Sequence, residues 1–188
     1  CLPAEFKHEL FSHGSRATAY GNIIAGGASA CILHYNHNNA ELKDGDLLLM
    51  DAGGELDGYA ADITRTYPVN GKFSEEQKAL YEVVLRAQLS CLEMAKPGVT
   101  HGDIEENAQR LLTEGLIELG ILDGDLTTLI EEKAYKAFYM HRIGHWIGLD
   151  VHDRGSYYVE KNWRKLEPNM AMTIEPGLYI PPRTEGVD

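Results

Sequence analysis

The segment DAGGELDGYAADITRTYP, residues 51–68, constrains the fold of this chain more than any other stretch. Two strand-like runs flank Asp57-Gly58, a dipeptide that is a strong signal for a β-hairpin with a two-residue turn. Counting outward from such a turn fixes which residues oppose each other across the hairpin. We therefore predict an antiparallel hairpin in which Asp51 faces Thr64.

The predicted hairpin brings two carboxylates onto one face of a sheet. Asp62 faces Gly53, and residues two apart on one strand share a face, so Asp51 and Asp62 become diagonal neighbours, about 7–8 Å apart at Cα. Two ionised carboxylates held together repel each other unless they share a proton or a cation neutralises them. The plain alternative is an exposed sheet face that carries ordinary surface acids. The hairpin is thus a candidate metal site.

The remaining pattern is strands, then two long helices, then strands again, which predicts an α+β fold with a sheet covered on one side. Glycine-rich turns, capping boxes and apolar runs delimit these elements. The expected elements are two strands separated by a turn within residues 20–37, a strand within 44–54, helices from Ser74 to before Pro97 and from Thr100 to Gly120, and an apolar strand within 169–182.

Composition excludes several partners. The 188-residue chain, long enough for one domain, has a formal net charge of −12, which would repel nucleic acid and anionic membranes. It contains no apolar run long enough to span a bilayer. Cys1, Cys31 and Cys91 form no CxxC pair, which favours a reducing compartment without a disulfide framework. We expect a cytoplasmic protein without nucleic-acid or membrane partners.

Three histidines lie close together in HRIGHWIGLDVHD, residues 141–153. His141 and His145 have the spacing of a helical metal pair, but the glycines beside them make a regular helix unfavourable. We predict instead a glycine-hinged loop that delivers one imidazole to a metal and keeps the others, including His152, nearby. A single histidine is more often a structural residue, although three within one short segment are harder to explain in that way.

Glu175 is a carboxylate inside the apolar run NMAMTIEPGLYIPP. It is either a turn acid before Pro176 or a further ligand. Together with two aspartates and one histidine it would complete an oxygen-rich donor set, which suits Mn, Co, Fe(II) or Zn better than a thiolate site would.

Three motifs in order resemble those of the Xaa-Pro aminopeptidases: DAGGELDGYAADITRTYPVNGKFS, HRIGHWIGLDVHDRG and LEPNMAMTIEPGLYI. These are metallopeptidases with the pita-bread fold, shared with prolidase, methionine aminopeptidase and creatinase. The resemblance implies an α+β pita-bread fold, with a curved, mostly antiparallel sheet covered by helices. It further implies that residues 1–188 are a partial catalytic domain, incomplete at both ends.

The resemblance also implies a site. The ligands of two divalent metal ions, with manganese expected and Asp62 bridging, would be Asp51, Asp62, His145 and Glu175. The catalytic residues would be Glu175, as acceptor of a water proton, with His152 and His34. The pocket for the proline side of the substrate would contain His141 and Tyr179.

The implied activity is removal of the N-terminal residue that precedes proline in peptide substrates. The resemblance further implies that the full-length parent is a homo-oligomer. Trp146 favours aminopeptidase P over prolidase, which usually has Phe there. A prolidase-type dipeptidase, a non-catalytic pita-bread binding module and a purely structural acidic protein remain the alternatives.

One departure from the family pattern concerns the fifth metal ligand. The family has a bridging glutamate on a later strand, and we identify no such strand in residues 1–188. Glu185, in RTEGVD, is superficially similar, but this segment directly follows Pro182 and is interpreted as the loop that precedes that strand. We therefore expect this chain alone to have little or no peptidase activity.

Overall fold

The computed structural model describes residues 1–182, which form two compact units. The first comprises Cys1–Ser74 and Trp146–Arg154. The second comprises Glu75–His145 and the described part of Gly155–Asp188. Within the described residues, no helix is both long and apolar enough to cross a membrane.

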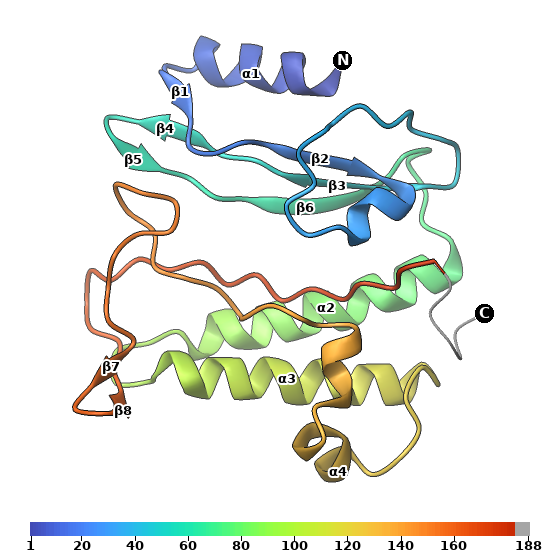
Figure 1. The fold of residues 1–188 in the computed structure, drawn as a ribbon, viewed down its shortest axis with the longest axis vertical. Coiled ribbons are helices and arrows are strands. Elements are labelled where there is room, and N and C mark those ends of the chain that lie inside the picture. Colours follow the sequence, from blue (N-terminus) through green and yellow to red (C-terminus); the bar gives the residue numbers. More distant parts are fainter. Residues whose placement is uncertain (183–188) are drawn as a thin grey trace. The chain divides into compact units, whose positions relative to one another are not determined.

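The first unit is built on antiparallel strands (Figure 1). One sheet has the order β1-β4-β5 and another the order β2-β3-β6. The elements are α1 (Leu2–Ser12), β1 (Ala17–Thr18), β2 (Ile23–Gly26), the 3₁₀ helix η1 (Gly27–Cys31), β3 (Leu47–Asp51), β4 (Gly54–Leu56), β5 (Tyr59–Ala60) and β6 (Thr64–Pro68).

The predicted hairpin is confirmed in its register. Asp51 pairs with Thr64 in β3 and β6, and Leu56 pairs with Tyr59 at the turn. Asp57 and Gly58 both have positive φ, 51° and 85°. Positive φ at both central residues is the requirement of a type I′ turn, which explains the choice of Asp-Gly.

Glycine is also required where the two arms of the hairpin lead from one sheet into the other. A Cβ atom at Gly53 would overlap the carbonyl oxygen of Ala61. Backbone bonds continue across this interruption, from Ala52 N–H to Ile63 O (3.1 Å) and from Ala61 N–H to Gly54 O (2.9 Å). The close approach therefore keeps one register through both sheets.

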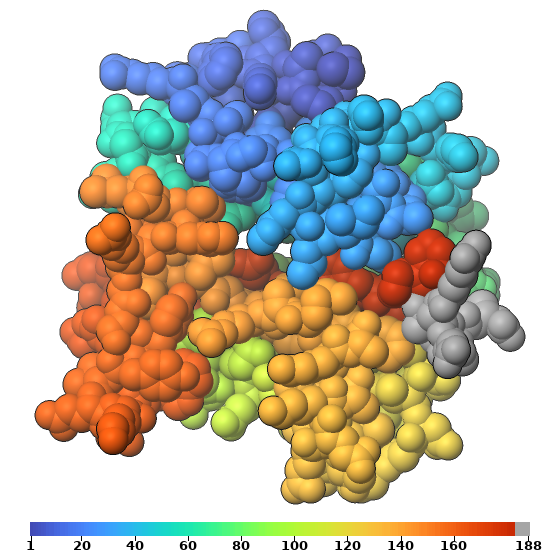
Figure 2. Space-filling model, viewed as in Figure 1, coloured from blue at the N-terminus to red at the C-terminus, as the bar shows by residue number. Residues whose placement is uncertain are grey.

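The expectation of a second strand within residues 20–37 was wrong. After β2 the chain turns into η1, and Ile32 N–H and Tyr35 N–H bond to carbonyl oxygens three residues earlier. Ile32 and Leu33 are 55% and 44% exposed. A strand needs a neighbouring strand to satisfy its backbone groups, whereas these groups are satisfied locally. Residues 27–46 lie on the visible face of this unit in light blue (Figure 2).

The second unit is mainly helical. Its elements are α2 (Glu75–Met94), α3 (His101–Glu118), α4 (Leu126–Glu131), the 3₁₀ helix η2 (Ala134–Ala137), β7 (Tyr158–Val159) and β8 (Asn162–Trp163). Figure 1 shows α2 and α3 side by side. They are close enough that a Cβ at Gly115 would overlap Val83.

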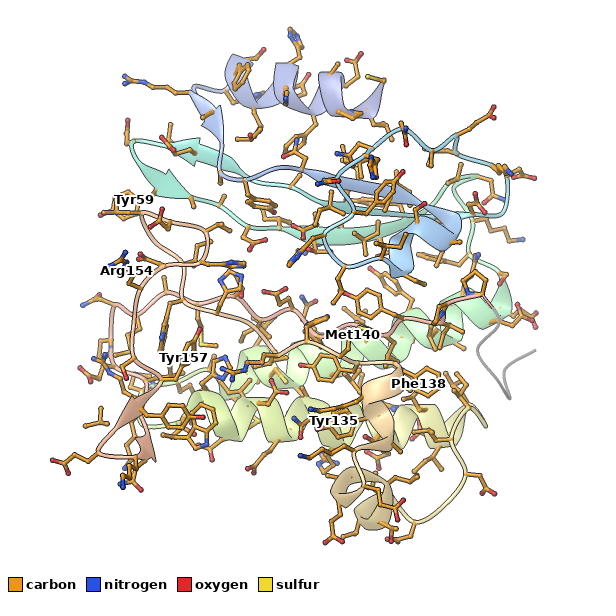
Figure 3. All side chains as sticks on the ribbon, in the orientation of Figure 1. Tyr59, Tyr135, Phe138, Met140, Arg154 and Tyr157 are labelled. Carbon is orange, nitrogen blue, oxygen red and sulfur yellow. The ribbon has the colours of Figure 1, made fainter. Side chains whose placement is uncertain are left out.

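The core of this unit joins α2 and α3 to the segment around η2, where Tyr135 and Phe138 are labelled in Figure 3. Its buried members are Val83, Ala87, Leu111, Leu112, Tyr135 and Tyr139. Val84 of α2 is partly buried and packs against this core.

The limits predicted for α3 are confirmed. Thr100 is its N-cap and forms a reciprocal capping box with Asp103, and Gly120, with φ 71°, follows the C-cap. Leu119 is the C-cap residue of α3 and is 37% exposed.

The apolar strand expected within residues 169–182 was also wrong. The segment runs beside the loop before it and makes separate backbone bonds to Phe138, Ile143 and His145. No named strand forms in these residues. The bonds from Thr173 to His145 and from Glu175 to Ile143 follow one antiparallel register, whereas the bond from Tyr179 to Phe138 does not continue it.

Candidate metal centre

In the first unit, the carboxylates of Asp51 and Asp62 converge on one hydroxyl group. Tyr20 Oη lies 2.5 Å from Asp51 Oδ1 and 3.0 Å from Asp62 Oδ1. Both aspartates are half-buried. Two carboxylates can reach one hydroxyl only from the same face, so the predicted placement of Asp51 and Asp62 as neighbours on one face is confirmed.

Sequence reasoning missed Tyr20. The pKa of its phenol is raised, mainly because burial disfavours the phenolate and further because Asp51 and Asp62 are acceptors and negative charges beside it. Tyr20 therefore stays neutral and donates to the carboxylates without adding charge. The negative charge of the pair is left for a cation to neutralise.

In the second unit, His145 and Glu175 form a close pair. His145 Nε2 lies 3.2 Å from Glu175 Oε1, and their side chains are 20% and 35% exposed. Thr173 connects them: its Oγ1 accepts from His145 N–H at 2.9 Å and donates to Glu175 Oε1 at 2.7 Å. An imidazole nitrogen and a carboxylate oxygen at this separation are suited to share a cation.

The backbone around His145 adopts the predicted non-helical loop. Thr173 N–H donates to His145 O, and Glu175 N–H donates to Ile143 O, both at 2.8 Å. A Cβ at Gly144 would overlap the carbonyl oxygen of Thr173, so only glycine allows the loop to lie this close. The two ligand-bearing segments are therefore held together by main-chain bonds.

The structure brings the two predicted pocket residues together. His141 Nε2 lies 3.0 Å from Tyr179 Oη, and His141 Nδ1 lies 2.8 Å from Arg142 O. A carbonyl oxygen only accepts, so Nδ1 carries the hydrogen and Nε2 accepts from the Tyr179 hydroxyl. The rings meet edge to face, with centroids 5.5 Å apart.

His34 and His152 both lie in the first unit and are exposed. His34 has positive φ, 55°, and follows η1. His152 lies on the segment that bonds to the hairpin through Ala60 N–H and Gly148 O, at 2.8 Å. Their catalytic roles stay predictions. Glu185 lies outside the described residues.

The predicted ligands thus form two pairs, one in each unit. Asp51 and Asp62 supply carboxylate oxygens, and His145 and Glu175 supply an imidazole nitrogen and a carboxylate oxygen. This donor chemistry fits a hard or borderline divalent ion such as Mn²⁺ or Zn²⁺. The residues present therefore fit the metal that the sequence motifs imply.

Comparison with known proteins gives consistent results. An Xaa-Pro aminopeptidase from Haemophilus influenzae is 52% identical over 179 residues, which cover 95% of this chain and 41% of the relative. The structure of Pseudomonas aeruginosa aminopeptidase PepP has a TM-score of 0.98 at 54% identity, covering 100% of this chain and 42% of that one. Zinc-substituted Escherichia coli aminopeptidase P in complex with product has a TM-score of 0.93 at 46% identity, covering 98% and 42%.

The chain thus spans about two fifths of the length of these relatives. The match to the aminopeptidase P structures confirms the predicted pita-bread fold. The model of metallopeptidase family M24 matches residues 2–188. With the fold and the paired ligands described above, this match establishes that the chain belongs to metallopeptidase family M24.

Proposed function

We propose that this chain carries the larger part of the metal site of an Xaa-Pro aminopeptidase. The observation that carries the proposal is the pair Asp51 and Asp62, held on one face by the hairpin and converging on Tyr20. A relative that is 52% identical to this chain is named Xaa-Pro aminopeptidase, which supports the same activity. Residues 1–188 would be a partial catalytic domain.

The proposed ligands of two divalent ions are Asp51, Asp62, His145 and Glu175, with Asp62 bridging. A bound divalent ion would lower the pKa of a water molecule toward neutrality and polarise the scissile carbonyl. Manganese is the proposed metal because three of the four ligands are carboxylates.

The protein's own groups would move protons and orient the substrate. Glu175 would accept the proton of the attacking water, and the Thr173 hydroxyl on its Oε1 would hold it in one rotamer. His152 would donate a hydrogen bond to the substrate carbonyl oxygen. His34 would deliver a proton to the departing proline nitrogen.

The edge-to-face pair of His141 and Tyr179 would line the pocket for the proline ring. Proline in the second position has a fixed φ and no N–H, so a shaped apolar wall can select it. Peptides with proline in that position are the proposed substrates.

Two alternatives differ in measurable ways. A prolidase-type enzyme would prefer an Xaa-Pro dipeptide to a longer peptide with the same first two residues. A non-catalytic binding module would hold peptide or metal without turnover. The presence of all four proposed ligands favours a catalytic site over a binding module that has lost them. These ligands are Asp51, Asp62, His145 and Glu175.

We further propose that the full-length parent is a cytoplasmic homo-oligomer and that this chain alone is nearly inactive. A bridging glutamate on a later strand would supply the fifth ligand.

The test uses the full-length protein with added Mn²⁺ and a pair of tripeptides that differ only in having proline or alanine in second position. We expect release of the first residue from the proline peptide alone, and its loss in Asp51→Asn. Equal cleavage of both peptides, or turnover that survives Asp51→Asn, would contradict the proposal.

A further inference from the structure

Helix α3 contacts the loop that carries His145 through two polar side chains, Glu105 and His101. We propose that both are positioning residues, which fix the direction of the His145–Glu175 pair without binding metal or substrate themselves. The inference rests on the proposed function, because it assumes that this pair holds a metal ion.

Glu105 supplies the acceptor for a buried backbone group. Ile143 is fully buried, and its N–H donates to Glu105 Oε2 at 2.5 Å. The other carboxylate oxygen accepts from Gln109 Nε2 at 2.8 Å, and Tyr139 Oη lies 3.5 Å from Oε2. A buried N–H without an acceptor destabilises the folded state, because it loses its bond to water and gains none in return. The carboxylate is therefore fixed on the loop from several sides.

His101 contacts the next peptide group. It is 2% exposed, and its Nε2 lies 3.0 Å from Gly144 O. Because a carbonyl oxygen only accepts, Nε2 carries the hydrogen and donates. Nδ1 is buried and has no hydrogen-bond partner among the described residues. The one polar contact of this ring within residues 1–182 is thus directed at the loop.

Aromatic side chains fix the plane of the His101 ring. Trp163 stacks on it, with centroids 5.9 Å apart and planes 20° apart, and Tyr157 meets it edge to face at 4.9 Å. Tyr157 is labelled in Figure 3, on the segment before β7. A Cβ at Gly102 would overlap Trp163, so the aromatic ring lies directly on the first turn of α3.

The spacing of the two residues explains why they act together. Glu105 follows His101 by four positions, so both side chains lie on one face of α3. They bond to the N–H of Ile143 and the C=O of Gly144, which are consecutive residues. A regular, capped helix is a rigid support, and two contacts fix both the position and the rotation of this short stretch of backbone.

The loop transmits this constraint to both ligands. Ile143 O accepts from Glu175 N–H, while His145 bonds to Thr173 through its N–H and its C=O. Displacing Ile143 therefore moves the backbone of His145 and of Glu175 together. Groups that orient metal ligands typically change metal affinity by about 10- to 100-fold when they are removed.

The experiment uses the full-length protein loaded with Co²⁺, and measures the Kd and the visible absorption bands of the bound ion. Glu105→Ala should weaken binding by about tenfold and shift the bands, because the ligand field depends on the direction of His145. Glu105→Gln should stay within about threefold of wild type, because its amide oxygen still accepts from Ile143 N–H. Glu106→Ala, on the exposed side of the same helix, is the matched control and should leave both values unchanged.

His101→Phe provides the second variant if Glu105→Ala fails to fold. It keeps the aromatic volume but removes the donor to Gly144 O, and should weaken Co²⁺ binding by about three- to tenfold. A folded Glu105→Ala or His101→Phe protein with the wild-type Kd and wild-type bands would overturn the inference. If wild type binds Co²⁺ and the variants bind it less well, but wild type cleaves no Xaa-Pro peptide, the positioning role stands and the proposed function fails.

Discussion

At the scale of single residues, the hydroxyl of Tyr20 bonds to the carboxylates of both Asp51 and Asp62. Folding raises the pKa of this phenol, through burial first and the two aspartates second. In the unfolded chain the phenol would ionise near its ordinary value of about 10. A raised folded pKa means that the folded state keeps its proton when the unfolded state releases one. The stabilisation is therefore complete below about pH 10 and is lost as pH rises above it.

The metal-free protein should accordingly lose stability above about pH 10, by up to about 1.4 kcal/mol per pH unit for each such tyrosine once the unfolded phenol is fully ionised. Tyr139 behaves similarly, because burial and then the charge of Glu105 raise its pKa. Tyr20→Phe should remove the contribution of one tyrosine to this decrease of unfolding free energy with pH. Denaturant unfolding at a series of pH values measures it, and an unchanged slope in the variant would show that the Tyr20 proton is not retained by folding.

Asp62→Asn tests the bridging carboxylate. Because both metal ions would need Asp62, the full-length variant should lose peptidase activity and much of its bound metal. Metal analysis after gel filtration gives the content directly. Asp44→Asn, at an exposed position of the same unit, is the control. Full activity and wild-type metal content in the Asp62 variant would exclude a two-metal site.

Substitutions of His145 and of His141 should have different effects on metal content and on turnover. His145→Ala should lose metal, because His145 Nε2 is paired with the carboxylate of Glu175. His141→Ala should keep metal and mainly impair turnover of the proline peptide, because its ring bonds to Tyr179. Metal content and kinetic constants measured side by side separate the two roles, and equal metal loss would show that both histidines are ligands.

At the scale of elements, the sequence predicted what is locally determined. The hairpin register follows from Asp57-Gly58, and the ends of α3 follow from Thr100 and Gly120. The missed strands, within residues 20–37 and 169–182, depend on neighbours that a local pattern does not reveal.

The same limit applies to the site. Asp51 and Asp62 could be paired by counting along one hairpin. The partners Tyr20 and Glu105 come from segments distant from the residues they contact, while Thr173 lies two residues before Glu175. Each is an ordinary residue in its local context.

Gly53→Ala should perturb the hairpin where its two arms approach most closely. The new methyl group would overlap Ala61 O, beside Asp62, so the backbone there must shift. We expect a loss of about 1–3 kcal/mol in unfolding free energy, as for other overpacked sites, together with weaker metal binding. Gly21→Ala, where a Cβ meets nothing within 4 Å, is the matched control. Equal, small effects in both variants would mean that the approach is easily relaxed.

At the scale of the whole molecule, the number of protein ligands to the metal ions should determine whether the chain is active. Residues 1–188 expressed alone should show little or no cleavage of an Xaa-Pro peptide with excess Mn²⁺, because metal affinity depends on ligand count and geometry. The full-length parent, assayed in parallel, is the reference. Turnover comparable to that of the parent would mean that the fifth ligand is dispensable or is replaced by Glu185 or Asp188.

The boundary between the two units falls directly after a proposed ligand, because the chain passes from the second unit to the first between His145 and Trp146. The bonds of His145 to Thr173 and its contact with Glu175 all lie within the second unit. The distance between this imidazole and the Glu175 carboxylate is therefore set by the second unit alone.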